Sequence, residues 1–158
     1  LFAYGIKSIN QPFMDFAAGF CEYECLECGE ACPTGAIRPL SVAEKRRAQI
    51  GEARFIEERC IVITEGTACG ACAEVCPTGA ARMVPLREQL TIPITTPEVC
   101  IGCGHCENAC PAEPQKAIIV EAKAIHGRAL PAIPKEEPPA AGEELMTDNI
   151  AGEDECPF

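Results

Sequence analysis

The run CIGCGHCENACP, at residues 100–111, decides how the whole sequence is interpreted. It spaces four cysteines closely and ends on Cys-Pro, and two earlier stretches follow a similar plan. We call these stretches the first, second and third copies, and their cysteines are Cys21, Cys25, Cys28 and Cys32, then Cys60, Cys69, Cys72 and Cys76, then Cys100, Cys103, Cys106 and Cys110. The run CPTGA occurs in the first two copies, at residues 32–36 and 76–80. The chain therefore contains an internal repeat.

The spacing within each copy points to iron–sulfur chemistry. Two residues between cysteines let three thiolates converge on one site, and Gly102 and Gly104 suit a loop that approaches an inorganic core closely. The chain then makes about one helical turn, which Pro111 ends, so the fourth cysteine points elsewhere. Bacterial ferredoxins bind [4Fe–4S] clusters with the same spacing. The sequence predicts about three [4Fe–4S] clusters bound by twelve of the thirteen cysteines.

The pairing of the copies stays open at this level, because in two-cluster ferredoxins the fourth cysteine completes the other motif's cluster. The short, hairpin-like connection at residues 81–99 favours pairing of the second and third copies. One cluster would then take Cys60, Cys69, Cys72 and Cys110, and the other Cys76, Cys100, Cys103 and Cys106. The first copy would hold its own cluster, with Cys32 or an outside ligand as the fourth. Pairing of the first and second copies is the rival, since residues 52–59 also resemble a strand entering a cluster loop.

Other uses of cysteine fit the pattern less well. Zinc ribbons use two separate CxxC knuckles and need no Cys-Pro end, and disulfide frameworks rarely repeat such tight local spacing. The first copy has the spacing of radical S-adenosylmethionine enzymes, but Glu27 stands where those enzymes usually have an aromatic residue. His105 and His126 are expected at the surface, and Cys156 is expected to be a free thiol.

The composition limits the classes of function. The formal net charge of the 158 residues is −11, so no nucleic acid partner is expected. No apolar run is long enough to span a bilayer, and no secretory signal is visible. Because the sequence begins at Leu1 rather than Met, we expect a trimmed form. Its location is expected to be cytoplasmic or membrane-associated.

The expected fold is α+β, with ferredoxin-like bicluster modules of short β-hairpins and short helices around the clusters. Residues 1–59 are expected to hold the first copy and an inserted helix at 42–50, residues 60–126 a two-motif ferredoxin-like domain, and residues 127–158 an extended, proline-rich acidic tail. Ser41 and Glu44 form a capping box for the inserted helix. The basic run 45–47 is expected to be a solvated helix face, with docking of an acidic redox partner as the alternative. Strands are expected at 54–56, 81–86, 90–95 and 117–121.

Residues 11–126 resemble the ferredoxin-like proteins that accompany periplasmic nitrate reductase, of the NapG/NapH type, and related membrane-associated bacterial polyferredoxins. The resemblance rests on the three motifs in this order, on the longer gap after Cys60 and on the final run at 100–111. It implies a role in passing electrons from a quinol-linked donor at the membrane towards a terminal reductase. Members of that family usually carry a further N-terminal cysteine motif, which this sequence lacks.

The expected function is relay of single electrons through three [4Fe–4S] clusters, within a membrane-associated redox system. No nucleophile, acid–base pair or open metal position is evident, so an electron carrier is expected rather than an enzyme. The alternative is a redox- or oxygen-sensing or assembly module, in which the clusters are structural.

Overall fold

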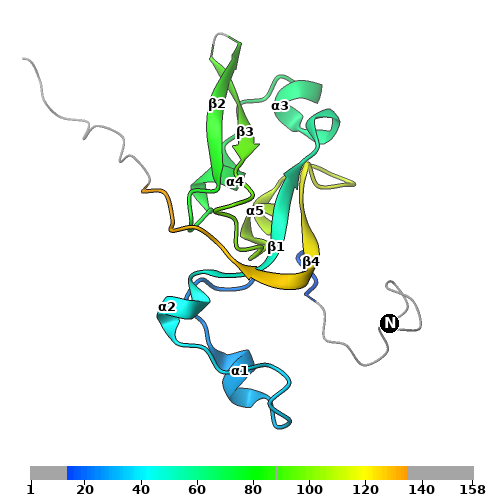
Figure 1. The fold of residues 1–158 in the computed structure, drawn as a ribbon. Helices are drawn as coiled ribbons and strands as arrows, with labels where there is room; N and C mark the ends of the chain where they lie inside the picture. The colour runs from blue at the N-terminus through cyan, green and yellow to red at the C-terminus, as the bar shows by residue number, and fades with distance from the viewer. Residues whose placement is uncertain (1–13, 88, 135–158) are drawn as a thin grey trace, which may run out of the picture.

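A computed structural model describes residues 14–87 and 89–134 of the chain. The elements are short and follow the order α1 (Glu27–Ala31), α2 (Val42–Lys45), β1 (Ala48–Phe55), the 3-10 turn η2 (Glu57–Arg59), α3 (Ile61–Thr64), α4 (Ala71–Glu74), β2 (Ala81–Arg87), β3 (Leu90–Thr95), α5 (His105–Ala109) and β4 (Ile118–Arg128). Figure 1 shows them in place. Short helices and strands in this order are an α+β fold, as expected.

Two antiparallel ribbons form the frame of the molecule. Strands β2 and β3 make a local hairpin, in which Ala81 pairs with Thr95. Strands β1 and β4 are joined across a long sequence separation, with Ala53 opposite Val120, and the register shifts between Gln49 and Gly51. The predicted hairpin strands at 81–86 and 90–95 are confirmed. Most of the segments 54–56 and 117–121 lies in the longer strands β1 and β4, with Ile56 and Ala117 just outside them.

The core consists mainly of cysteine and small apolar side chains. Cys60, Cys76, Cys100, Cys106 and Cys110 are buried in one cluster, together with alanines and a few larger residues such as Val62 and Ile118. Ile118 is the largest side chain that is almost fully enclosed in the described residues. Such a core buries little apolar surface for a chain of this length. We therefore expect the stability of the fold to depend on the cysteine sites as well.

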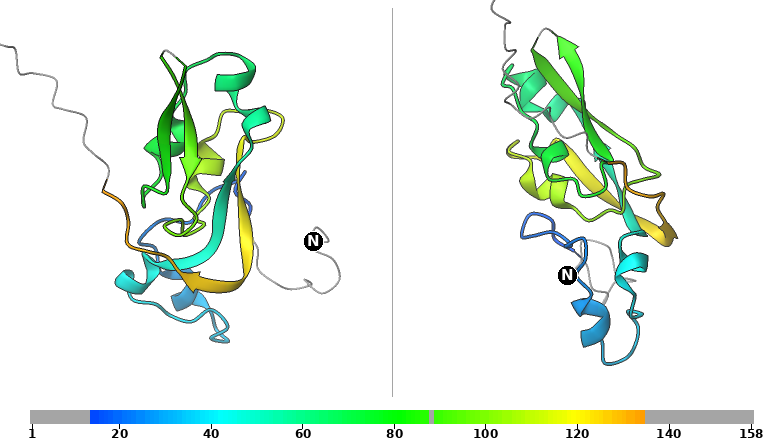
Figure 2. Two further views of the ribbon diagram at one scale, coloured as in Figure 1. Left: turned by 45° about the horizontal axis from the view of Figure 1, so that its top comes forward. Right: turned by 90° about the vertical axis from the view of Figure 1, so that its left-hand side faces the viewer.

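The helices of the copies are distributed along the molecule rather than gathered on one face. Figures 1 and 2 show α1 and α2 at one end, α3 at the opposite end, and α5 between them beside the β1–β4 ribbon. Helices α1 and α2, which belong to the segment with the first copy, extend away from the two ribbons in each view.

The expected helix at 42–50 is wrong beyond its first turn. Its capping box is present, since the Ser41 hydroxyl accepts from the Glu44 N–H and the Glu44 carboxylate accepts from the Ser41 N–H. The helix nevertheless ends at Lys45, and β1 begins at Ala48. Residues 48–53 alternate between half-buried and buried, the period of a strand, because β4 and the third copy lie beside them. Pairing with a distant strand overrides the local helical preference.

The same pairing links two of the expected segments of the chain. Strand β1 lies before residue 60 but pairs with β4, so the segment 1–59 contributes a strand to the body formed by residues 60–126. At the start of the expected tail, residues 129–133 lie along the body, where Ala129 donates to Arg47 O, Leu130 to Glu98 O and Ile133 to Thr78 O. Residues 135–158 of the tail, with Cys156, lie outside the described residues.

Candidate iron–sulfur centres

Four cysteines from two copies line one apolar cavity. Cys60 precedes α3, Cys69 lies in the loop before α4, Cys72 lies in α4 and Cys110 follows α5. The cavity is completed by apolar side chains, which include Phe55, Ile61, Val62, Pro93 and Ile118. Burial, with the neighbouring Cys69 and Cys110, raises the pKa of the Cys72 thiol to about 11. The sequence-based pairing of the second and third copies brings the same four residues together.

A second group combines Cys76 with the three leading cysteines of the third copy. All four are buried, with exposed fractions between 6% and 9%. Burial, with the neighbouring Cys76, Cys100 and Cys21, raises the pKa of the Cys103 thiol to about 11. Burial, Cys103, Cys100 and Cys76 also raise the pKa of Cys106. The charge of a thiolate is costly in such a place unless a cation lies beside it, as the irons of a cluster would.

Backbone N–H groups point at the sulfur of the last cysteine in each copy. The donors are Ile37 to Cys32, Ala81 to Cys76 and Ala117 to Cys110, each at 3.4 Å. Ala53 in β1 donates to Cys100 in the same way, at 3.3 Å. Such donors stabilise negative charge on sulfur and are typical of cluster-binding loops.

The repeated run CPTGA has a local structural reason. In both copies the threonine hydroxyl lies beside the preceding cysteine sulfur, at 3.6 Å for Thr34 and 3.7 Å for Thr78. Gly35 and Gly79 follow with φ of 66° and 67°, and the turn brings the N–H five residues after the cysteine back to its sulfur. The repeat therefore encodes a turn that places a backbone N–H on the cysteine sulfur.

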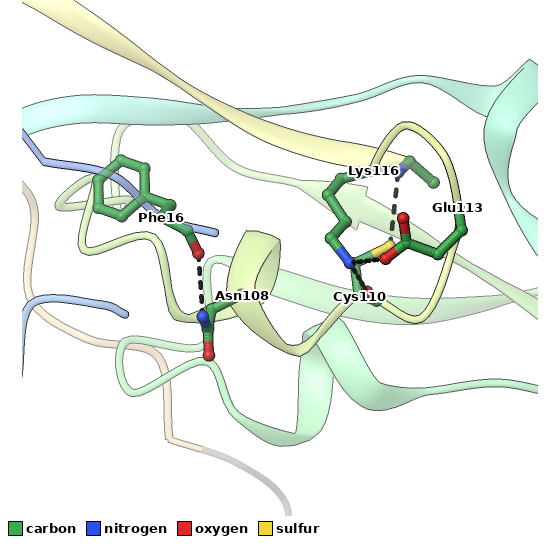
Figure 3. Close-up of polar contacts among 6 residues, drawn as sticks. Phe16, Asn108, Cys110, Glu113 and Lys116 are labelled. Carbon is green, nitrogen blue, oxygen red and sulfur yellow. Dashed lines mark hydrogen bonds and ion pairs between the residues drawn. The ribbon is translucent and has the colours of Figure 1, made fainter. Parts of the chain in front are cut away.

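In the third copy, which lacks the run CPTGA, a lysine side chain binds the backbone of the last cysteine. Lys116 donates to Cys110 O at 2.9 Å and to the Glu113 carboxylate at 2.8 Å. Figure 3 shows these contacts beside the bond from the backbone N–H that follows Lys116 to the Cys110 sulfur. Lys116 thus holds the loop that presents Cys110 to the first cavity.

The first copy lies in a more open setting. Cys28 is exposed, and Cys25 and Cys32 are half-buried. The Ile37 N–H and the Thr34 hydroxyl lower the pKa of Cys32 to about 7. Cys21 differs from these three, because it packs against Ile101 and Cys103 of the third copy. In residues 14–87 and 89–134, no three Cys, His, Asp or Glu side chains are placed to hold one metal ion.

The side chains of the basic run 45–47 contact other parts of the molecule. Lys45 donates to the Cys21 sulfur at 3.1 Å and to Glu22 O at 3.2 Å. Arg46 forms an ion pair with Glu24 and lies over the Tyr23 ring, and Arg47 donates to Ala129 O at 2.9 Å. Arg46 and its ion pair stay exposed, whereas Lys45 and Arg47 are half-buried. The prediction of a solvated helix face is therefore wrong for Lys45 and Arg47.

His105 is only half exposed, because its ring stacks on Phe20 with centroids 3.6 Å apart. His126 lies in β4 and is exposed, as expected. The stack on Phe20 could not be read from sequence, because the two residues are far apart in the chain.

The comparison with known families settles what kind of protein this is. The 4Fe-4S dicluster domain matches residues 20–80 and again residues 65–114. The chain belongs to the 4Fe-4S dicluster domain family. One of the two cysteine groups lines an apolar cavity and the other is buried, and both have N–H donors aimed at sulfur. These features fit the thiolate ligation that [4Fe–4S] clusters need.

Part of this chain is similar to a ferredoxin-type protein. The methylamine utilization ferredoxin-type protein MauM of Methylobacillus flagellatus is 34% identical over 90 residues, which are 54% of this chain and 38% of that protein. The chain therefore spans well under half the length of this relative. No solved structure matches the chain.

As a dicluster-domain protein, the chain is a ferredoxin-type electron carrier rather than an enzyme, and it binds [4Fe–4S] clusters. The expectation of a bacterial ferredoxin-type protein is confirmed at this level, and likeness to the NapG/NapH type in particular stays a prediction. None of the helices in the described part of the chain is long and apolar enough to cross a membrane.

Proposed function

We propose that the chain binds three [4Fe–4S] clusters and relays single electrons between redox partner proteins. The proposed ligand sets are Cys60, Cys69, Cys72 and Cys110 for the second-copy site, Cys76, Cys100, Cys103 and Cys106 for the third-copy site, and Cys21, Cys25, Cys28 and Cys32 for the first-copy site. The observation that carries the proposal is the gathering of two cysteine quartets across the second and third copies. The N–H donors on Cys32, Cys76, Cys100 and Cys110 support it.

The protein groups around each site have distinct tasks in this proposal. When bound, a [4Fe–4S] cluster accepts and releases one electron. The cysteine thiolates anchor it, the backbone N–H groups stabilise the added negative charge, and the apolar walls exclude water from the second- and third-copy sites. The first-copy site is more accessible, because Cys28 is exposed.

We further propose that the chain works within a membrane-associated redox system, between a quinol-linked donor and a terminal reductase. The support is the order of its motifs and its similarity to MauM, whose name assigns that protein to methylamine utilization. Partners of this kind would exchange electrons by docking, without conversion of a substrate by this chain.

Electron counting tests the relay directly. Anaerobic protein titrated with dithionite is expected to take up about three electrons per chain, because each [4Fe–4S] cluster accepts one. Mixing the reduced protein with excess oxidised cytochrome c should return them all, as seen by the reduced haem absorbance. A protein that stores electrons but passes none to any acceptor would favour the sensing or assembly alternative.

Lys45 is expected to tune the first-copy site, because its ammonium group lies 3.1 Å from the Cys21 sulfur. Removing this charge in Lys45→Met disfavours the added electron, so the potential of that site should fall. We expect about a tenfold change in its reduction equilibrium, or ~59 mV for one electron. Potentiometric titration followed by EPR measures this shift.

Two variants check that the effect belongs to the charge at this position. Lys45→Arg keeps the charge and should restore most of the potential. Arg54→Met removes a cation from the exposed pair with Glu121 and should leave the first-copy potential unchanged. Equal shifts in Lys45→Met and Arg54→Met would contradict a local role for Lys45.

A further inference from the structure

The segment before the first copy is fastened to the third copy. Phe16 lies against Gly104, where a Cβ atom would overlap the phenyl ring. Asn108 in α5 donates to Phe16 O at 2.9 Å, as Figure 3 shows. Phe20 stacks on His105, the first residue of α5. Contacts with both the loop and the helix fix the start of the first copy against the third.

The ligand residues themselves meet at this junction. The Cys21 N–H donates to Cys103 O at 2.8 Å, and both side chains belong to one small apolar cluster with Ile101. Cys21 is the first proposed ligand of the first-copy site, and Cys103 is a proposed ligand of the third-copy site. A single hydrogen bond therefore links the backbones of two neighbouring sites.

The third copy also contacts the second. Cys76 of the second copy lies with the cysteines of the third, and Cys110 of the third lies in the cavity of the second. Helices α4 and α5, which carry Cys72 and Cys106, pack together. The second and third copies thus exchange residues across their shared core.

The first and second copies lie at opposite ends of this arrangement. Helix α1 of the first copy and helix α3 of the second are at the two ends of the molecule, with α5 between them, in all three views (Figures 1 and 2). The order in space is therefore first, third, second, although the order in the sequence is first, second, third.

We propose that the third-copy site is the middle of the relay, so that an electron crossing the molecule passes from the first-copy site to the third-copy site to the second-copy site, or in reverse. This deepens the proposed function and rests on it. In each step one site loses one electron and its neighbour gains it, while no bond forms or breaks and no proton moves. The middle site is the most enclosed, with all four cysteines buried, so external partners meet the two ends.

Spin coupling between reduced sites tests the order. Magnetic dipolar coupling falls steeply with distance, so neighbouring reduced clusters broaden each other's EPR signals and distant ones do not. The full chain, reduced with dithionite, is compared with Cys106→Ser, which removes a ligand of the middle site, and with Cys69→Ser, which removes a ligand of an end site. The expected result is loss of broadening in Cys106→Ser and its retention in Cys69→Ser.

The opposite pattern, with broadening lost in Cys69→Ser and kept in Cys106→Ser, would overturn the proposal, because it places the second-copy site in the middle. Equal spectra for the two variants would overturn it too. If the unmodified chain binds no iron, the proposed function fails and no EPR signal appears, so that failure is distinct.

A variant that changes no proposed cluster ligand also tests the order of the sites, in case a cysteine variant does not fold. Asn108→Ala removes the bond to Phe16 and should weaken the coupling between the first- and third-copy sites, while iron content and the coupling of the other pair persist. Arg54→Gln, in an exposed ion pair, is the matched control and should change neither. Unchanged coupling of the first-copy site in Asn108→Ala would argue against a junction at α5.

Discussion

Gly102→Ala is expected to disrupt the third copy and to lower the free energy of unfolding by about 3–5 kcal/mol. Gly102 has φ of 74°, and a Cβ atom there would overlap the backbone of Gly51 in β1. The two backbones also contact each other beside this position, since Ile50 N–H donates to Ile101 O at 3.1 Å. The third copy can therefore lie on β1 only with glycine at this position. Denaturant unfolding of the anaerobic protein measures the loss, and iron content reports whether the adjacent site survives.

Gly66→Ala separates steric overlap from backbone strain. Gly66 has φ of 67°, almost the same as Gly102, but no atom lies within 4 Å of a Cβ placed there. Its substitution should cost only about 1–2 kcal/mol, the penalty for a left-handed residue. Similar losses in the two variants would mean that the contact with Gly51 contributes nothing.

Cys76→Ser is expected to remove the cluster of the third copy, although Cys76 belongs to the second copy by sequence. Its sulfur accepts from the Ala81 N–H and lies among buried cysteines of the third copy. The protein should lose about four of its irons, since each cubane holds four. The EPR signal of the second-copy site should persist. Iron analysis together with EPR of the reduced protein measures both effects.

Cys156→Ser is the matched control, because Cys156 stands outside the three copies in the sequence. It should leave iron content and spectra unchanged. Loss of the second-copy signal in Cys76→Ser, with the third-copy signal intact, would refute the exchanged pairing of the fourth cysteines.

The cysteine groups were largely predictable because their chemistry is local. Tight spacing fixes which thiolates can converge, and the short connection between the second and third copies leaves a hairpin as the simplest link. Strands β2 and β3 form that hairpin close to its predicted bounds. The twelve ligands themselves stay a prediction.

The parts that sequence could not supply depend on distant contacts. Residues 46–50 look helical by themselves, but β1 forms there because β4, far along the chain, supplies its partner. Lys45 and Arg47 look like a charged helix face, but their partners are Cys21, before the helix, and Ala129, near the end of the described residues. The capping box at Ser41, a purely local signal, was correct.

Iron and acid-labile sulfide content of the anaerobically reconstituted full chain tests the central claim most directly. Three clusters require about twelve irons and about twelve sulfides per chain, with the broad visible absorption of cysteine-ligated [4Fe–4S] groups. Because the second- and third-copy sites are built into the core, loss of the metal should also unfold the protein. A colourless, iron-free protein that is well folded, or one that holds only zinc, would contradict the account.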